Sequence, residues 1–288
     1  MKLYKLRQGM IIEEDNQYFR LNHDWDNLTN RDNLFGYLRD LTGKAGKMTE
    51  EDASQLIKIE LQPPVGQQEV WAAGVTYLRS REARMEESKQ SGGADFYDKV
   101  YEAERPELFF KAIPQRIAGH RQEVYIRRDS TWNVPEPELT LFINSAGDIQ
   151  AYTIGNDMSS RSIEGENPLY LPQAKVYEKS AALGPCLYVP ENGIDPETKI
   201  EMTIRRDISV VFREDVSISR MKRQHTELAG YLFRECDFPQ GVFLMTGTCI
   251  VPPPDFTLQQ DDWVDIRIDK IGVLSNPVGY RQSRYPIL

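Results

Sequence analysis

The sequence predicts a β-rich α+β fold in which a small N-terminal α+β domain precedes a larger, strand-rich domain. Short strand-like segments separated by turns open the chain, and hairpin-like pairs of strands fill its second half. A proline-rich boundary, Pro-Pro-Val-Gly at 63–66, lies between the two parts. We therefore place the domains at residues 1–64 and 65–288.

The N-terminal domain is expected to combine three short strands with one helix. The strand-like segments are LYKL at 3–6, MIIE at 10–13 and YFRL at 18–21, broken at Gln8-Gly9 and Asp15-Asn16. The leucines at positions 34, 38 and 41 then follow helical spacing. They predict a helix that Asn27 or Thr29 caps and that ends before Gly43.

Two strands and an intervening polar segment open the larger domain. The strands are expected at 70–78, with the sequence VWAAGVTYL, and at 107–112, with ELFFKA. Residues 79–105 are polar and helix-forming, with an interruption at Gly92-Gly93. This segment predicts two short helices, which together are long enough to cover a site.

The second half contains two hairpins, one helix and two further strands. The hairpins pair LTLFI at 139–143 with IQAYTI at 149–154, and IEMTIRR at 200–206 with SVVFRE at 209–214. The helix is predicted by apolar residues at helical spacing from Met221 to Cys236, before Pro239. The final strands are expected at 242–248 and 263–271.

Composition excludes several classes of function. The formal net charge is −9 and the pI is about 5.1, so we expect no binding to nucleic acid or anionic membranes. The three cysteines are odd in number and far apart, which is typical of buried thiols in a reducing compartment. With no signal-peptide-like or membrane-spanning stretch, we expect a cytoplasmic location.

Glu136 and Glu138 are the first candidate site residues. Residues i and i+2 of an extended segment point to the same side, roughly 6.5–7 Å apart, so the two carboxylates repel each other unless they are solvated or bridged by a cation. By itself the pair is also compatible with a solvated, acidic strand end. The neighbouring hairpin, with Ile143 paired to Ile149, favours the cation.

The hairpin returns a third carboxylate to the same place. Its register puts Leu139 opposite Thr153 and brings Asp157 back beside Glu136. Asp157 reaches the same face only through a one-residue bulge, which Gly155 is expected to supply. Three carboxylates with no nearby histidine or cysteine suit Mg²⁺ or Mn²⁺ rather than Zn²⁺.

Lys175 follows the acidic cluster in the sequence. It stands between apolar neighbours in the segment QAKVY. One interpretation is a surface lysine whose stem packs on apolar neighbours. The other is a proton carrier or enolate stabiliser beside the metal, and the spacing alone leaves both interpretations open.

Four motifs together resemble the fumarylacetoacetate hydrolase family over residues 70–280. They are GNDMSSRS at 155–162, Gln173-Ala174-Lys175, Gly184-Pro185 and Thr246-Gly247-Thr248. The resemblance implies a mixed β-sandwich or roll, a homodimer or homotetramer, and a 2-keto acid substrate chelated on Mg²⁺ (or Mn²⁺). It also implies that Glu136, Glu138 and Asp157 are the metal ligands.

The chain departs from the family's hydrolases at one motif. Many of them carry N-Y-x-x-H-x-x-E after the first core strand, and here Ser80 and Ala83 stand in place of the histidine and the glutamate. A neutral serine does not activate water at pH 7. Residues 74–81 and 107–111 instead resemble the dehydratase branch, which converts acids such as 2-keto-3-deoxy-arabinonate to 2,5-dioxopentanoate.

The expected activity is therefore Mg²⁺-dependent dehydration of a 2-keto-3-deoxy sugar acid. Lys175 and Glu107 are expected to be the acid and base, in either order. The residues expected to bind substrate are Thr76, Tyr77, Arg79, Arg81, Lys111 and Thr248, although ordinary surface charge explains the two arginines equally well. The alternatives are a C–C bond hydrolase of the acylpyruvate or fumarylacetoacetate type, a 2-keto acid decarboxylase, and a non-catalytic 2-keto acid sensor.

Overall fold

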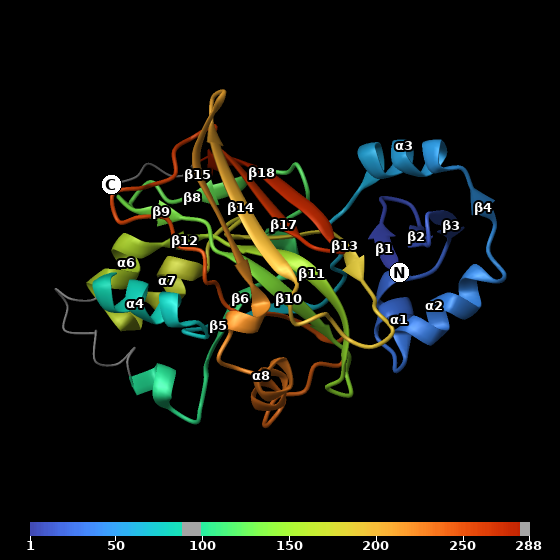
Figure 1. The fold of residues 1–288 in the computed structure, drawn as a ribbon, viewed down its shortest axis with the longest axis horizontal. Helices are drawn as coiled ribbons and strands as arrows, with labels where there is room; N and C mark the ends of the chain where they lie inside the picture. Colours follow the sequence, from blue (N-terminus) through green and yellow to red (C-terminus); the bar gives the residue numbers. More distant parts are fainter. Residues whose placement is uncertain (88–98, 283–288) are drawn as a thin grey trace.

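The computed structural model describes residues 1–87 and 99–282, and these residues form two packed β-sheets (Figure 1). Ten strands of the larger sheet lie side by side in the order β4 (Lys47–Met48), β3 (Gln17–Leu21), β2 (Met10–Glu14), β1 (Lys2–Lys5), β13 (Ala181–Tyr188), β11 (Ile149–Asp157), β10 (Pro137–Ile143), β16 (Val242–Met245), β5 (Glu69–Gly74) and β6 (Glu107–Ala112). A short strand, β7 (Ile117–Ala118), pairs with β13.

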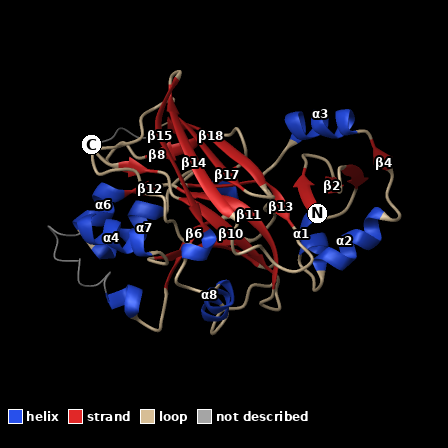
Figure 2. Cartoon of the chain, viewed as in Figure 1, coloured by secondary structure: helices blue, strands red, loops and turns tan. Residues whose placement is uncertain are grey.

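The smaller sheet packs against one face of the larger sheet. Its strands lie in the order β15 (Ser209–Ser217), β14 (Lys199–Arg206), β17 (Trp263–Ile268), β18 (Gly272–Tyr280) and β8 (Val124–Ile126). A separate pair joins β9 (Asn133–Val134) to β12 (Ser159–Ser160). Figure 2 shows these strands crossing the middle of the molecule, with helices around them.

Alternating side chains build the core between the two sheets. In β10, Leu139 and Leu141 point into it, and Ile200 and Met202 of β14 meet them from the smaller sheet. All four side chains are buried. Because side chains alternate along a strand, Glu138 and Thr140, which adjoin Leu139, face the opposite side of the large sheet.

Helices α1 (Trp25–Thr29) and α2 (Leu34–Thr42) of the N-terminal part cover that opposite side. Helix α3 (Glu50–Glu60) packs on the other face, where Ala53 joins the core between the sheets. The helix predicted from the leucine spacing is α2 and is confirmed. Its predicted cap is wrong, because Asn27 and Thr29 belong to α1 and the Asn33 side chain accepts the hydrogen bond from the Gly36 N–H at 3.1 Å.

The three predicted N-terminal strands are present, and they extend the large sheet. Their turns fall at Gly9 and at Asp15-Asn16, where φ is positive. Leu3 of β1 pairs with Leu187 of β13, so the sheet runs without interruption from the N-terminal part into the rest of the chain. The boundary at residue 64 stays a prediction.

The second hairpin matches the sequence analysis more closely than the helix after it. Strands β14 and β15 pair across Asp207, as predicted. Helix α8 spans only His225–Leu232, because a capping box between Gln224 and Glu227 starts it four residues after Met221. The helix ends before Cys236, so the expectation that this thiol is buried is wrong; it is exposed.

Three further helices gather at one end of the large sheet (Figure 2). They are α4 (Leu78–Glu87), α6 (Arg161–Glu166) and α7 (Leu171–Lys175). Short 3-10 turns occur at Pro114–Arg116, Pro168–Tyr170 and Ile218–Arg220. Of the two helices predicted within 79–105, α4 and a helical turn at 99–102 are described, whereas the interruption at Gly92-Gly93 lies outside the described residues. No helix in the described ranges is long and apolar enough to cross a membrane.

Candidate active site

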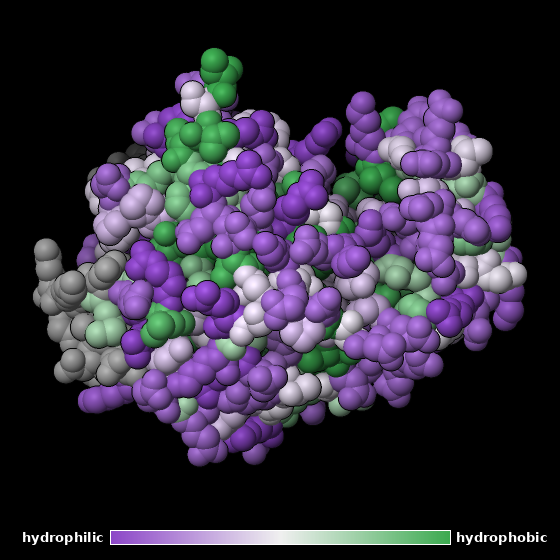
Figure 3. Space-filling view, in the orientation of Figure 1, coloured by the Kyte–Doolittle hydropathy of each residue, from purple (hydrophilic) through white to green (hydrophobic). Residues whose placement is uncertain are grey.

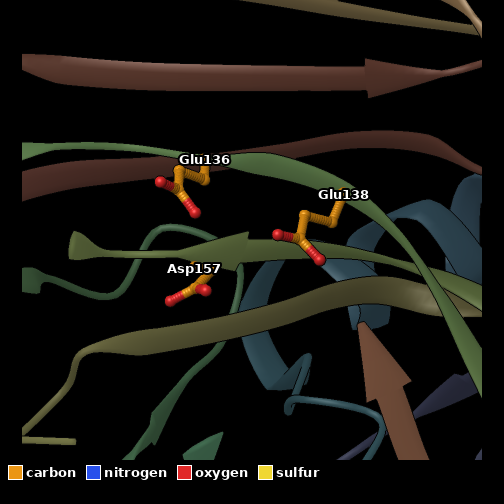
Figure 4. A group of neighbouring side chains, drawn as sticks. All are labelled: Glu136, Glu138 and Asp157. Carbon is orange, nitrogen blue, oxygen red and sulfur yellow. The ribbon is translucent and has the colours of Figure 1, made fainter. Parts of the chain in front are cut away.

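Three buried carboxylates meet at the end of β10 and β11 (Figure 4). Glu136 directly precedes β10, Glu138 lies within it, and Asp157 ends β11. One oxygen from each lies within 4.8 Å of the other two, and the residues are 5%, 1% and 1% exposed, respectively. Carboxylate oxygens so close together, away from water, fit a hard divalent cation such as Mg²⁺.

The bulge that aligns the three carboxylates lies at the other end of the hairpin from the predicted position. Ile143 pairs with Ile149 as expected, but Phe142 pairs with Ala151, which leaves Gln150 as the extra residue. The shift puts Leu139 opposite Ile154, so the predicted pairing with Thr153 is wrong. It also removes the need for a bulge at Gly155.

Gly155 has a different function, because it leaves room behind the carboxylates. It pairs with Glu138, and a Cβ built on it would clash with Thr140 Oγ1 and lie 3.1 Å from the end of the Met245 side chain. Two residues further on, the Asp157 N–H donates to the Glu136 carbonyl at 2.9 Å. These contacts set the spacing of the cluster.

Lys175 lies directly against two of the three carboxylates. Its Nζ is 2.6 Å from Glu136 Oε2, 3.0 Å from Asp157 Oδ2 and 2.6 Å from Ser159 Oγ. The side chain is 1% exposed, which excludes the surface interpretation. The structure therefore places the predicted proton carrier at the predicted metal site.

Lys111 is a second lysine that contacts the cluster, at Asp157. Its Nζ lies 2.5 Å from Asp157 Oδ1 and donates to the Met158 carbonyl at 3.0 Å. The side chain is fully buried and does not line the cavity in front of the carboxylates. Burial lowers the pKa of the Lys111 ammonium, although the Asp157 charge partly offsets this.

The surroundings shift the pKa values of Glu138 and Asp157 in opposite directions. Burial, followed by the charges of Asp157 and Glu136, raises the pKa of Glu138 well above its ordinary value. Burial would also raise the pKa of Asp157, but Lys111 and Lys175 outweigh it, and this pKa lies below its ordinary value. Glu138 is thus the carboxylate whose charge most needs a bound cation.

The Thr-Gly-Thr motif, which directly follows strand β16, supports Glu138. The Gly247 N–H donates to Glu138 Oε2 at 2.6 Å. Gly247 has φ +95°, and a Cβ there would clash with Thr76 Oγ1, so glycine is required. Thr248 lines the cavity, and its hydroxyl donates to the Ile250 carbonyl at 3.2 Å.

Glu107 lies at the edge of the site. It pairs with Gly74, which lines the cavity, and a Cβ on Gly74 would clash with the Glu107 carboxylate. Among the described residues, the buried Glu107 Oε2 has no hydrogen-bond partner. A carboxylate that packs on a cavity-lining glycine keeps Glu107 a candidate acid or base.

The other predicted substrate-binding residues do not line the cavity. Thr76 donates to the Thr246 carbonyl at 2.7 Å, and Tyr77 is buried, which raises the pKa of its phenol. Arg79 pairs with Glu82 at 3.8 Å on the outer face of α4. Arg81 lies 4.8 Å from the centre of the Tyr101 ring. Roles for these residues in binding stay predictions.

The sequence analysis missed four polar residues of the site. Ser80 and Arg84 of α4 line the cavity, as does Arg161 of α6, which donates to Glu136 Oε1 at 2.9 Å. Glu164, also in α6, forms a buried ion pair with Arg84. Two of them carried a signal in the sequence, because Arg161 lies within the matched segment 155–162 and Ser80 stands at the family's histidine position.

Comparison with known proteins shows that this chain is similar to enzymes. The model of the C-terminal domain of fumarylacetoacetate (FAA) hydrolase matches residues 70–279. The chain is 50% identical over 216 residues to a probable 2-keto-3-deoxyxylonate dehydratase from Haloferax volcanii, covering 75% of this chain and 73% of that protein. It is 41% identical over 231 residues to 2-dehydro-3-deoxy-D-arabinonate dehydratase from Saccharolobus solfataricus, covering 80% and 78%.

Solved structures agree with the sequence comparisons. A 2-keto-3-deoxy-D-arabinonate dehydratase complexed with magnesium and 2,5-dioxopentanoate is 35% identical, with a TM-score of 0.82, and the match covers 98% of this chain and 100% of that one. The predicted fold class, β-rich α+β of this type, is confirmed.

Proposed function

Because this chain belongs to the fumarylacetoacetate hydrolase family, we propose that it is a Mg²⁺-dependent hydro-lyase that removes water from a 2-keto-3-deoxy sugar acid. The observation that carries the proposal is the buried carboxylate cluster with Lys175 against it. The relatives named above are dehydratases of such acids, and 2-keto-3-deoxy-arabinonate, converted to 2,5-dioxopentanoate, is the substrate we propose first.

The residues that would hold Mg²⁺ are Glu136, Glu138 and Asp157. When bound there, the ion supplies a Lewis acid that makes the C3 hydrogen of a 2-keto acid more acidic. Arg161 and the Gly247 N–H orient two of the carboxylates, and Lys111 holds the third. Such outer contacts fix ligands in place before the ion arrives.

The proton transfers are assigned to Lys175 and Glu107. One removes a proton from C3 and the other protonates the C4 hydroxyl, so that C4–O breaks and water leaves. In a five-carbon acid the unsaturated product then rearranges. One hydrogen leaves C5 and one leaves the C5 oxygen, while C3 and C4 gain one hydrogen each. The result is the 2,5-dicarbonyl.

The cavity wall explains why the proposal is dehydration rather than C–C hydrolysis. Hydrolysis needs a base that activates water, and the family's histidine position holds Ser80. The Ser80 hydroxyl donates to the Tyr77 carbonyl at 2.8 Å, and the following Ala83 is buried and apolar. In the described part of the chain, no histidine lines the cavity.

The proposal includes assembly of identical subunits in the cytoplasm. Apolar side chains gather on the projecting β14–β15 hairpin (Figure 3), where Ile208 is fully exposed and Val210 is 58% exposed. Exposed apolar groups of this kind favour contact with another chain. The three cysteines are free, which fits a reducing compartment. Light scattering of the purified protein tests for a homodimer or homotetramer.

The function is tested by turnover on a small panel of 2-keto acids. We expect Mg²⁺-dependent conversion of 2-keto-3-deoxypentonate, no activity after chelation, and little release of pyruvate from an acylpyruvate. Pyruvate release that matches or exceeds dehydration would instead support the hydrolase.

A further inference from the structure

Arg84 lies in the wall of the active-site cavity but has no part in the chemistry assigned above. It is four residues after Ser80 on α4, so the two side chains share one face of the helix, and both line the cavity. Glu82, on another face of α4, is exposed. Helix α4 therefore presents Arg84 to whatever occupies the space in front of the carboxylates.

Glu164 holds Arg84 in this position. The two charged groups form an ion pair, and their side chains are only 6% and 1% exposed. Burying a charge pair is costly unless its geometry is well defined, so the pair fixes α4 against α6. A guanidinium has five N–H donors, which lets Arg84 bind Glu164 and still donate to a ligand in the cavity.

The local charges indicate which part of a ligand Arg84 meets. Two separate charge groups surround the cavity. The carboxylates Glu136, Glu138 and Asp157 are matched by the cations Lys111, Lys175 and Arg161. The Arg84 charge is already neutralised by Glu164. A neutralised guanidinium suits an uncharged oxygen better than the acid end of the substrate, which the metal takes.

We propose that Arg84, positioned by Glu164, contacts the C5 oxygen of the substrate and selects 2-keto acids that carry one. This inference rests on the proposed function, in which C1 and C2 lie at the carboxylate cluster and the rest of the substrate extends away. The C5 oxygen is a hydroxyl in a 2-keto-3-deoxypentonate and a carbonyl in 2,5-dioxopentanoate. It accepts a hydrogen bond from a guanidinium in both forms.

Two unreactive ligands test the contact without any turnover. 5-Hydroxy-2-oxopentanoate and 2-oxopentanoate differ only in the C5 hydroxyl, and neither has a C4 hydroxyl to lose. Calorimetry with saturating Mg²⁺ should show that the wild type binds 5-hydroxy-2-oxopentanoate at least about 10-fold more tightly than 2-oxopentanoate. This is the ratio expected for a hydrogen bond to a charged group. Arg84→Met should bring this ratio close to one, and Arg84→Lys should restore part of it.

The controls separate binding from folding and from the activity itself. Glu82→Gln, on the exposed face of α4, should keep the wild-type ratio. If Arg84→Met does not fold because Glu164 is left unpaired, the double variant Arg84→Met/Glu164→Met removes both charges and should show the same lost ratio. Glu164→Gln should lower the ratio without changing the affinity for 2-oxopentanoate, as expected for a positioning residue.

Two results would overturn the inference. One is a wild-type protein that binds both ligands equally, and the other is a preference that survives in Arg84→Met. Because the two ligands have neither a C4 hydroxyl to lose nor an acylpyruvate C–C bond to hydrolyse, these binding measurements are independent of whether the enzyme dehydrates or hydrolyses its substrate. Failure of the proposed function would appear instead as absent turnover of 2-keto-3-deoxypentonate.

Discussion

The Asp157 backbone N–H donates to the Glu136 carbonyl at 2.9 Å, and this one ladder bond brings the first and last carboxylates of the site opposite each other. The bond exists because the extra residue of the hairpin lies at Gln150, near the turn. Without that shift, Asp157 would point to the other face of the sheet. The carboxylate cluster proposed to hold Mg²⁺ is thus a consequence of strand register.

Glu138→Gln should remove most of the Mg²⁺ affinity while the fold survives. Because we propose that Glu138 binds the ion directly, we expect affinity to fall by at least about 100-fold, more than is usual when a residue that only orients a ligand is lost. Because burial raises the pKa of Glu138, its charge is unfavourable without a cation, and the metal-free variant should resist urea as well as the wild type. Calorimetry measures the Mg²⁺ affinity and urea unfolding measures the stability. The control is Glu235→Gln, at an exposed position. Full activity of Glu138→Gln after chelation and Mg²⁺ re-addition would refute the role.

Lys175→Met should abolish turnover and leave the metal bound. Lysine is not a ligand, and loss of its positive charge beside Glu136 and Asp157 favours a cation at those carboxylates. We expect turnover to fall at least 100-fold, on the order of a lost acid–base group. Steady-state kinetics and Mg²⁺ titration measure the two effects, with exposed Lys199→Met as control. Near-normal turnover would show that Lys175 only holds the cluster together.

Gly155→Ala should destabilise the protein by about 1–3 kcal/mol, because the new Cβ clashes with Thr140 Oγ1 and crowds Met245 behind the site. Gly230→Ala is the matched control. Gly230 lies in α8 with no atom within 4 Å of an added Cβ, and that substitution should stabilise by about 0.4–1 kcal/mol. Urea unfolding measures the free energy of both variants. Equal effects would contradict the packing described around Gly155.

The free energy of unfolding should depend on pH through His225. Burial lowers the pKa of this histidine from its ordinary value of 6.5, so the unfolded chain binds more protons than the folded chain as pH falls below that value. Its contribution to stability is complete above about pH 6.5 and is lost as pH falls through the folded pKa. The stability difference between wild type and His225→Gln should therefore shrink between pH 8 and pH 5. A difference that stays constant would contradict this.

Local patterns in the sequence predicted the elements whose structure depends on residues close to one another along the chain. Strand β6 has the predicted bounds, and β14 and β15 pair across the predicted turn. Alternating apolar residues and a turn residue between them contain all the information that such a hairpin needs. The carboxylate cluster was predictable for the same reason, because a hairpin connects its members.

Features that depend on distant contacts were not predictable. A one-residue shift at Gln150 leaves no mark in composition, although it reverses the faces of every residue beyond it. From the sequence alone, Arg84 and Glu164 are expected to be solvent-exposed charges on short polar helices. Only the packing of α4 on α6 buries them together at the cavity. Arg79 and Arg81, chosen from the same helix, do not line the cavity.

The most direct test of the central claim is the product of one reaction, uniformly ¹³C-labelled 2-keto-3-deoxy-arabinonate with the enzyme and Mg²⁺. Dehydration keeps the carbon chain intact, because only water leaves. We predict a single five-carbon product, 2,5-dioxopentanoate, with all labels retained in one molecule by mass spectrometry. Appearance of labelled pyruvate together with a two-carbon aldehyde would show cleavage of the carbon chain and would contradict the assignment as a hydro-lyase.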